Sequence, residues 1–431
     1  MTSRSILPIA HPGSNPFWRH FAWTARLLRA RMPDMQNFNY HNPTRYVYGP
    51  GEHRHIGQLL KPYAQGKILL HYGSGSIIRS GLLQTVKDSL AEHGISYVEL
   101  GGVKPNPSVE LVREGIELCR KERVKLVLAV GGGSVIDSAK GIAVGAPNNG
   151  DVWELYSRKG SVPKHDPLPV ATVLTLPAAG SENSPNTVLS NEKTGRKLGF
   201  KHMGLRPVLS IVDPTLFLTL PRAQMAYGAC DMMCHIFERY FTNTTQTALT
   251  DALAEATMRT IMEQSIILSS DLQNIDAWGQ LALSGTVAHN DLLGLGREQS
   301  WACHAMEHEL SAVYDVPHGG GLAVIIPAYM EAVWSYNPGI FAQWACHVMG
   351  VPPHRDTAAV VREGIRRLRA WYQLLGLPQT MQELGIPADA DFDAMANAAC
   401  KVYDRDAATP TLAGVHPLTA EEAAAIYKAT I

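Results

Sequence analysis

The sequence predicts two domains of different class, an α/β domain followed by an all-α domain. The chain has 431 residues, more than a single domain usually holds. From residue 67 short apolar runs alternate with amphipathic stretches of helical length, which is typical of a doubly wound, mainly parallel sheet with right-handed crossovers. After Pro221 alanine, leucine and methionine dominate, and the apolar spacing is helical up to residue 431. We therefore expect domains at 35–215 and 216–431.

Each predicted element has its own pattern. Buried strands are expected at the short apolar runs 67–71, 96–100, 125–130, 169–174 and 209–212. Helical apolar spacing predicts helices at 77–93, 109–122 and 134–144, and Ser-Asn-Glu-Lys-Thr-Gly at 190–195 is typical of a hairpin turn. In the second domain the same spacing predicts helices at 222–241, 247–270, 275–292, 298–313, 319–334, 357–375 and 419–429.

Composition and charge exclude several classes of partner. Lys and Arg number 38 against 39 Asp and Glu, and no basic run exceeds a pair, so there is no electrostatic footprint for nucleic acid. No apolar stretch is long enough to span a bilayer. The six cysteines lack the spacing of a disulfide framework, which favours a reducing compartment. We expect a soluble, cytoplasmic protein that acts on a small molecule.

Residues 1–34 differ from the rest of the chain. They hold five arginines, one acid (Asp34) and several aromatic residues, without a continuous apolar segment or a cleavage site of the kind a signal peptide needs. The composition resembles an organelle transit peptide. We favour an appended leader of marginal order, or a start codon assigned too early, with the true start at Met35.

A glycine run lies where a predicted strand meets a predicted helix. Gly131, Gly132, Gly133 and Ser134 follow the strand at 125–130. Glycines let backbone N–H groups approach a phosphate, and a helix N-terminus adds partial positive charge. The run lacks the G-x-G-x-x-G order of the common dinucleotide fingerprint, and a simple tight turn is the alternative. We favour a phosphate site.

A second glycine turn, formed by Gly73, Ser74, Gly75 and Ser76, follows the first strand of the sheet. An NAD-specific site usually has an acid near such a strand end to bind the ribose 2′-hydroxyl. No acid occurs between Glu52 and Asp88, and Arg79 follows closely. The turn therefore favours NADP over NAD, although on spacing alone these residues could merely turn the chain.

The predicted helices carry residues with metal-ligand spacing. Asp231 and His235 are four apart, so both project from one helical face, and His304 and His308 repeat this spacing. His318 lies on a turn just before another predicted helix. Three histidines and one aspartate would leave positions open on ferrous iron, and zinc accepts the same ligands. Cys230, Cys234 and Cys303 lie nearby, but without C-x-x-C spacing we interpret them as filling between helices.

In order along the chain, these motifs resemble those of the iron-containing (group III) alcohol dehydrogenases. The resemblance runs from Gln36 to the carboxyl end and is strongest with the branch of NADPH-dependent aldehyde reductases and butanol dehydrogenases. The residues that carry it are Asn37 to Arg45, Gly73 to Ser76, Gly131 to Lys140, Thr175 to Glu182, Asp213-Pro214, Asp231-x3-His235 and His304-x3-His308-x9-His318-Gly.

The resemblance implies an α/β dinucleotide domain, a helical metal domain and hydride transfer between NADP(H) and an alcohol or aldehyde. We also expect the protein to form a homodimer. The resemblance implies that the metal ligands are Asp231, His235, His304 and His318, and that His308 is a cleft histidine able to carry a proton. It also implies cofactor contacts from the glycine loop, Asp137, Thr175 and Leu176, and from Lys197 near the cofactor ribose. One departure stands out: Ala179 replaces the family's usual threonine, which removes one hydroxyl contact.

Alternatives to this interpretation differ in chemistry. Dehydroquinate synthase resembles this two-domain plan, but uses bound NAD and zinc for an elimination and cyclisation and needs a basic phosphate-binding cleft. Few arginines lie beside the predicted ligands, so we favour the dehydrogenase. Polyol oxidation of the glycerol dehydrogenase kind and a non-catalytic metal-binding protein are the remaining alternatives.

Overall fold

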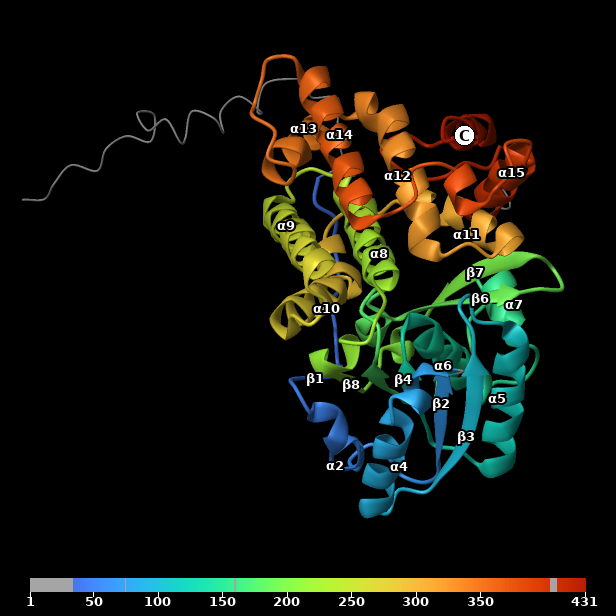
Figure 1. Ribbon diagram of the computed structural model, residues 1–431. Helices are drawn as coiled ribbons and strands as arrows, with labels where there is room; N and C mark the ends of the chain where they lie inside the picture. Colours follow the sequence, from blue (N-terminus) through green and yellow to red (C-terminus); the bar gives the residue numbers. More distant parts are fainter. Residues whose placement is uncertain (1–33, 74, 159, 404–408) are drawn as a thin grey trace, which may run out of the picture.

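A parallel sheet forms the centre of the first domain. The structure is a computed structural model that describes residues 34–73, 75–158, 160–403 and 409–431 (Figure 1). All the neighbouring strands of the six-stranded sheet run parallel, in the order β1-β8-β5-β4-β2-β3. Their bounds are β1 (Arg45–Tyr48), β2 (Ile68–Gly73), β3 (Tyr97–Val103), β4 (Leu126–Gly131), β5 (Val170–Leu174) and β8 (Leu209–Val212). The predicted doubly wound, parallel α/β class is confirmed.

Helices cover both faces of this sheet because its strands are apolar on both sides. Alternate residues of β4 belong to two separate hydrophobic clusters: Val127 packs with one set of helices and Leu128 with the other. The first face is covered by α5 (Val109–Glu122) and α6 (Gly133–Gly145), and the second by α2 (Ile56–Leu60) and α4 (Leu82–Glu92). A short helix, α7 (Trp153–Ser157), follows α6.

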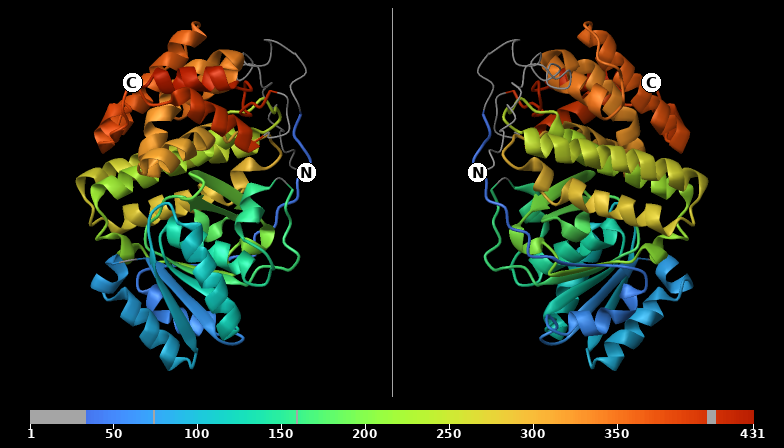
Figure 2. Two further views of the ribbon diagram at one scale, coloured as in Figure 1. Left: turned by 90° about the vertical axis from the view of Figure 1, so that its right-hand side faces the viewer. Right: turned by 90° about the vertical axis from the view of Figure 1, so that its left-hand side faces the viewer.

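The second domain is helical. Figures 1 and 2 show its helices at the opposite end of the molecule from α2 and α4. Helix α8 is almost entirely buried and packs against α9, α10, α12 and α14. The bounds are α8 (Arg222–Tyr240), α9 (Ala248–Ser270), α10 (Ile275–His289), α11 (Ala302–Tyr314), α12 (His318–Val333), α13 (Pro338–His347), α14 (Thr357–Leu375), α15 (Phe392–Tyr403) and α16 (Ala420–Lys428). Within the described residues, no helix combines the length and apolar character needed to cross a membrane.

Two segments from the first half of the chain contact the second domain. The antiparallel hairpin of β6 (Asn186–Asn191) and β7 (Arg196–Lys201) leaves the first domain and packs against α11. The extended segment 34–44 runs along the side of the molecule (blue in Figure 2), where the Gln36 N–H donates to the carbonyl of Gly296 over 2.8 Å. The predicted leader lies outside the described residues except for Asp34, and its proposed disorder stays a prediction.

Several element boundaries differ from expectation. The helix expected at 77–93 is interrupted: α3 (Ser76–Arg79) ends before Gly81, whose positive φ of 78° starts α4 in a new direction. The helix expected from 298 begins only at Ala302, because Ser300 N–H instead donates to the carbonyl of Glu238. Strand β1 and helices α2, α7, α13 and α15 have no counterpart among the expected elements.

Candidate functional site

The four predicted metal ligands lie on three helices of the second domain that pack together. Asp231 and His235 lie one turn apart on α8, His304 is on the first turn of α11 and His318 opens α12. Asp231 Oδ1 lies 3.4 Å from Nδ1 of His235, 3.5 Å from Nε2 of His304 and 3.7 Å from Nε2 of His318. Ligand atoms about 2.1 Å from one tetrahedral metal ion lie about 3.4 Å apart. The spacing therefore fits a shared cation.

Unpartnered polar atoms support this fit. Among the described residues, Asp231 Oδ1, His235 Nδ1 and His304 Nε2 are buried without a hydrogen-bond partner. Buried polar atoms are normally paired, and His235 Nδ1 and His304 Nε2 both lie within 3.5 Å of Asp231 Oδ1, which favours a shared cation site. Three imidazole nitrogens and a carboxylate oxygen form a donor set that both Fe²⁺ and Zn²⁺ accept.

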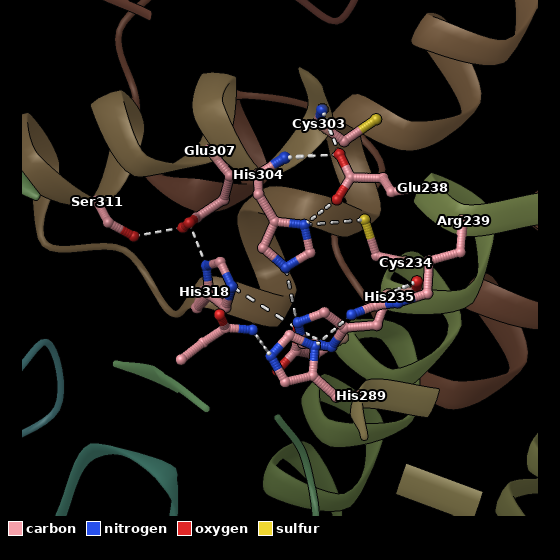
Figure 3. A network of polar contacts seen from close by, with 12 residues as sticks. Cys234, His235, Glu238, Arg239, His289, Cys303, His304, Glu307, Ser311 and His318 are labelled. Atoms are coloured by element: carbon pink, nitrogen blue, oxygen red, sulfur yellow. Dashed lines mark hydrogen bonds and ion pairs between the residues drawn. The ribbon is translucent and has the colours of Figure 1, made fainter. Parts of the chain in front are cut away.

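A buried glutamate orients the His304 imidazole (Figure 3). Glu238 Oε1 accepts the backbone N–H groups of Cys303 (2.7 Å) and His304 (3.1 Å), while Oε2 contacts Nδ1 of the His304 ring. Because the carboxylate holds the proton on Nδ1, the lone pair of Nε2 faces the centre of the site. Cys234 Sγ lies 3.7 Å from the same Nδ1, on the far side from Asp231, which agrees with a packing role for this cysteine.

A second buried glutamate, Glu307, contacts the imidazole of His318 as Glu238 contacts that of His304. Its Nδ1 contacts Glu307 Oε2, and the second oxygen of Glu307 accepts the hydroxyl of Ser311. The Nζ of Lys197 lies 3.4 Å from Glu307 Oε2 and 3.5 Å from His318 Nδ1. Burial opposes ionisation of Glu307, but the charges of His318 and Lys197 hold its pKa well below the usual range. Lys197, a predicted cofactor contact, thus lies against Glu307 and His318 in this structure.

His308 lies next to the four ligands without joining them at Asp231. Its ring centroid is 5.6 Å from that of His318 and 6.2 Å from that of His304. It is half-buried, whereas His304 is almost fully buried. With Glu307 and His318, His308 forms a second group whose ligand atoms lie within 4.8 Å of one another, and its role as a proton carrier stays a prediction.

The predicted phosphate loop has the expected form. Strand β4 ends at Gly131 and α6 begins at Gly133, with Gly132 as its N-cap and no side-chain cap on the helix N-terminus. A Cβ at Gly132 would lie 3.0 Å from that of Leu176, and one at Gly133 would lie 3.4 Å from that of Ala179. The loop, Leu176 and the replaced threonine position are therefore neighbours.

Residues 175–182 join this loop to the metal site. The Thr175 N–H donates to the carbonyl of Gly131 over 3.1 Å. On the other side, a Cβ at Gly228 of α8 would lie 2.5 Å from the carbonyl oxygen of Pro177. One short segment thus contacts both the glycine loop and the helix that carries Asp231 and His235.

Asp137 makes internal contacts. Its carboxylate accepts the hydroxyl of Ser181 over 2.6 Å and the backbone N–H of Val188 over 3.0 Å. The nearby Lys140 is fully buried, and its ammonium lies within hydrogen-bond distance of four oxygens of the segment 181–186, which share its three N–H groups. These groups fix the hairpin to α6, and a direct cofactor contact of Asp137 stays a prediction.

The second glycine turn carries the arginine expected near it. Gly75 is the N-cap of α3, and a Cβ there would lie 2.6 Å from Nη1 of Arg79. The guanidinium therefore lies directly over Gly75, at the end of β2. Gly73 closes that strand and Ser76 opens the helix, while Ser74 lies outside the described residues.

Sequence reasoning missed the partners of the ligands. Glu238 is seven residues after Asp231, on the same face of α8, and Glu307 is three residues after His304, so helical spacing could have found both. His289 and Arg239 also adjoin the site (Figure 3), but no spacing in the sequence connects His289 of α10 with His235 of α8.

The comparisons with known proteins agree with this geometry. Residues 43–214 match a family described as iron-containing alcohol dehydrogenase, and residues 225–431 match the C-terminal part of the Fe-containing alcohol dehydrogenase family. The chain therefore belongs to the iron-containing alcohol dehydrogenase family. Its class is that of a pyridine-nucleotide-dependent oxidoreductase of alcohols and aldehydes.

The relatives of this chain are named as dependent on different cofactors. The chain is 38% identical to NADH-dependent butanol dehydrogenase A of Clostridium acetobutylicum, covering 91% of this chain and 99% of the relative. It is 33% identical to the NADPH-dependent aldehyde reductase YqhD of Escherichia coli, covering 82% and 90%. The crystal structure of NADH-dependent butanol dehydrogenase A from Thermotoga maritima matches with a TM-score of 0.87 and 38% identity, over 92% of this chain and 99% of that one.

Proposed function

We propose that this protein is an NADPH-dependent aldehyde reductase that uses one divalent metal ion, Fe²⁺ or Zn²⁺. The observation that carries the proposal is that ligand atoms of Asp231, His304 and His318 lie within 4.8 Å of one another, with His235 Nδ1 3.4 Å from Asp231 Oδ1. Three of these four atoms, Asp231 Oδ1, His235 Nδ1 and His304 Nε2, are buried without a hydrogen-bond partner. These four residues are the proposed metal ligands. A bound metal ion supplies a Lewis acid for the carbonyl oxygen, and the reduced nicotinamide supplies the hydride.

The chain's own residues position the reactants and move the proton. The glycine loop 131–134 offers uncapped N–H groups to the pyrophosphate, and Thr175 and Leu176 lie between this loop and α8. His308 is the proposed proton donor to the oxygen that becomes the alcohol hydroxyl. The balance is aldehyde plus NADPH plus one proton, giving alcohol plus NADP⁺.

The preference for NADP(H) is supported by the β2 turn. Gly75 leaves the space that a carboxylate would occupy, and Arg79 lies over it with an exposed guanidinium. A guanidinium is well suited to bind a 2′-phosphate. Several relatives are named NADH-dependent, so the cofactor is the part of the proposal that most needs measurement.

The experiment combines metal analysis with a substrate panel. Metal-stripped protein refilled with Fe²⁺ or Zn²⁺ is assayed for NADPH oxidation with aldehydes of increasing chain length. His304→Ala and His318→Ala should lose the metal and at least about 10³-fold in kcat/KM, since a divalent ion without one of four protein ligands is held far less tightly. His308→Ala should keep the metal and lose kcat.

Two results would contradict the proposal. Stoichiometric metal in both ligand variants would show that the four proposed ligands do not form the metal site. Equal metal loss in His308→Ala would make His308 a ligand. His354→Ala, an exposed histidine outside the site, is the control and should match the unmodified protein. The proposal includes a cytoplasmic homodimer, which the family resemblance supports; light scattering measures the oligomeric state.

A further inference from the structure

The three imidazoles of the four proposed ligands are held in different ways. His304 and His318 each contact a buried glutamate through Nδ1. Among the described residues, His235 has no such carboxylate besides its fellow ligand Asp231. Its ring instead contacts that of His289, with the centroids 4.0 Å apart and the planes at 45° (Figure 3).

His289 itself is fixed by a buried arginine. Arg239 is fully buried and stacks on Trp301, 4.7 Å from the ring centroid. Its Nη1 donates to the carbonyl of His235 over 2.7 Å, and its Nη2 donates to Nδ1 of His289 over 3.1 Å. A guanidinium has no acceptor, so Nδ1 accepts and the ring proton is on Nε2.

The proton on Nε2 points to the first domain. Nε2 lies 2.9 Å from Nδ2 of Asn186, the first residue of β6, and a half-turn of that amide gives the ring N–H an oxygen acceptor. The backbone of the segment 175–182 is also close: a Cβ at Gly180 would lie 2.9 Å from that of His289. His289 therefore contacts a metal-ligand residue on one side and the nucleotide domain on the other.

We propose that His289 is a positioning residue of the metal centre. Its ring packs against the His235 imidazole and fixes the plane of that imidazole. The inference rests on the proposed function, because His235 is a ligand only there. Residues that orient a ligand without touching the metal typically change metal affinity by about 10–100-fold when they are removed.

The test measures metal binding directly. His289→Ala should lower the affinity for Co²⁺, measured in competition with a chromophoric chelator, by about 10–100-fold, and should shift the visible bands of the Co²⁺-loaded protein. His289→Phe keeps a ring against His235 and should recover most of this affinity. The control is His416→Ala, which removes a ring stacked on Tyr336 at 3.8 Å, far from the site in sequence and contacts, and should leave both readouts unchanged.

The outcomes separate this inference from the proposed function. Wild-type affinity and unchanged bands in His289→Ala would overturn the inference, and so would a His289→Phe variant as weak as His289→Ala, which would assign the effect to the lost hydrogen bonds. His235→Ala is measured alongside. If that variant binds Co²⁺ as tightly as the unmodified protein, the proposed ligand set fails instead.

Discussion

Single residues outside the proposed ligand set fix the orientation of the proposed ligands. Glu238 and Glu307 are almost fully buried, and each contacts the Nδ1 of one histidine. A carboxylate in this position fixes both the tautomer and the ring plane, and makes the imidazole a stronger base toward a cation. Removing either glutamate would leave the ligand in place but free to turn.

The residue at position 75 tests the cofactor assignment. Gly75→Asp should lower kcat/KM for NADPH by about 10–100-fold, because a carboxylate beside a 2′-phosphate costs several kcal/mol. The NADH value should change less than about threefold. The nearest atom to the new Cβ is the flexible end of Arg79, which can move, so the fold should tolerate the change.

Arg79→Leu is the companion variant for this test, since it removes the guanidinium without adding a charge. It should lower kcat/KM for NADPH and leave kcat/KM for NADH unchanged. Steady-state kinetics with both cofactors are the measurement, and an unchanged preference in both variants would show that the 2′-position lies elsewhere.

Glu309 on α11 predicts a pH dependence of stability. It is 7% exposed, and burial raises its pKa from 4.5 to about 7, although Arg196 lowers it. Because the folded-state pKa is the higher one, this carboxyl favours folding fully below pH 4.5, and the contribution is lost as the pH rises to 7. The loss amounts to about 3 kcal/mol, at about 1.4 kcal/mol per pKa unit.

Glu309→Gln cannot ionise and should therefore be more stable than the unmodified protein at pH 8, by about 2–3 kcal/mol, and close to it at pH 5. Urea unfolding at the two pH values measures this difference. Glu114→Gln, on an exposed position of α5, should show no such change. A constant difference between Glu309→Gln and the unmodified protein across this range would refute the assignment.

At the scale of elements, the close packing of α12 on α8 brings the ligands together. His318 begins α12, and Asp231 and His235 lie on α8. The next residue after His318 has no side chain: a Cβ at Gly319 would lie 2.2 Å from the carbonyl oxygen of Tyr227, a backbone atom that cannot move away alone. Because Gly319 has no side chain, α12 can lie close enough to α8 to bring His318 near Asp231.

Gly319→Ala should therefore weaken metal binding although it removes no ligand. The added methyl group pushes α12 away from α8 and increases the separation of His318 from Asp231. We expect at least about a tenfold loss of metal affinity, since outer groups that misplace a ligand have effects of this size. Chelator competition and thermal unfolding of the metal-free protein measure the effect.

The neighbouring glycine is the matched control for this variant. At Gly320 the nearest atoms, 3.2 Å and 3.3 Å away, belong to the side chains of Leu384 and Tyr227, which can shift. Gly320→Ala should bind metal as the unmodified protein does. Equal affinity in both variants would contradict the packing argument.

At the scale of the whole molecule, one carboxylate links the two domains. Asp291, just after α10, lies 2.7 Å from Nη2 of Arg206 and 3.2 Å from Nζ of Lys201 in the first domain. It also lies 3.9 Å from Arg239 of α8, which contacts His289. Its φ of 72° is a left-handed value that aspartate and asparagine tolerate better than most residues.

Asp291→Asn keeps this backbone preference and removes only the charge. Two buried guanidinium groups then lack their counter-ion, so the free energy of unfolding should fall by about 3 kcal/mol. Asp393→Asn, which breaks an exposed pair with Lys428, should cost less than about 1 kcal/mol. Urea unfolding followed by tryptophan fluorescence measures the free energy of unfolding of both variants. Equal decreases would mean that Asp291 contributes no more to stability than an exposed ion pair does.

Local patterns were sufficient for much of this structure. Strands β2, β4 and β5 and helix α5 follow from apolar runs and helical spacing, because these patterns depend on neighbouring residues only. The break of the 77–93 helix at Gly81 and the late start of α11 depend on a left-handed glycine and on a bond from Ser300 to α8. The second of these is a contact between distant parts of the chain, which no local pattern contains.

The sequence by itself determined the family, the class of fold and the four candidate ligands, because the i, i+4 pairs and the glycine run are local motifs with a specific chemistry. Only the tertiary structure decided which groups surround them. His289 on α10 reaches His235 on α8, and Lys197 contacts Glu307 across the two domains. The physical reason is that the orientation and protonation of a buried ligand depend on packing in three dimensions, and residues far apart in sequence supply it.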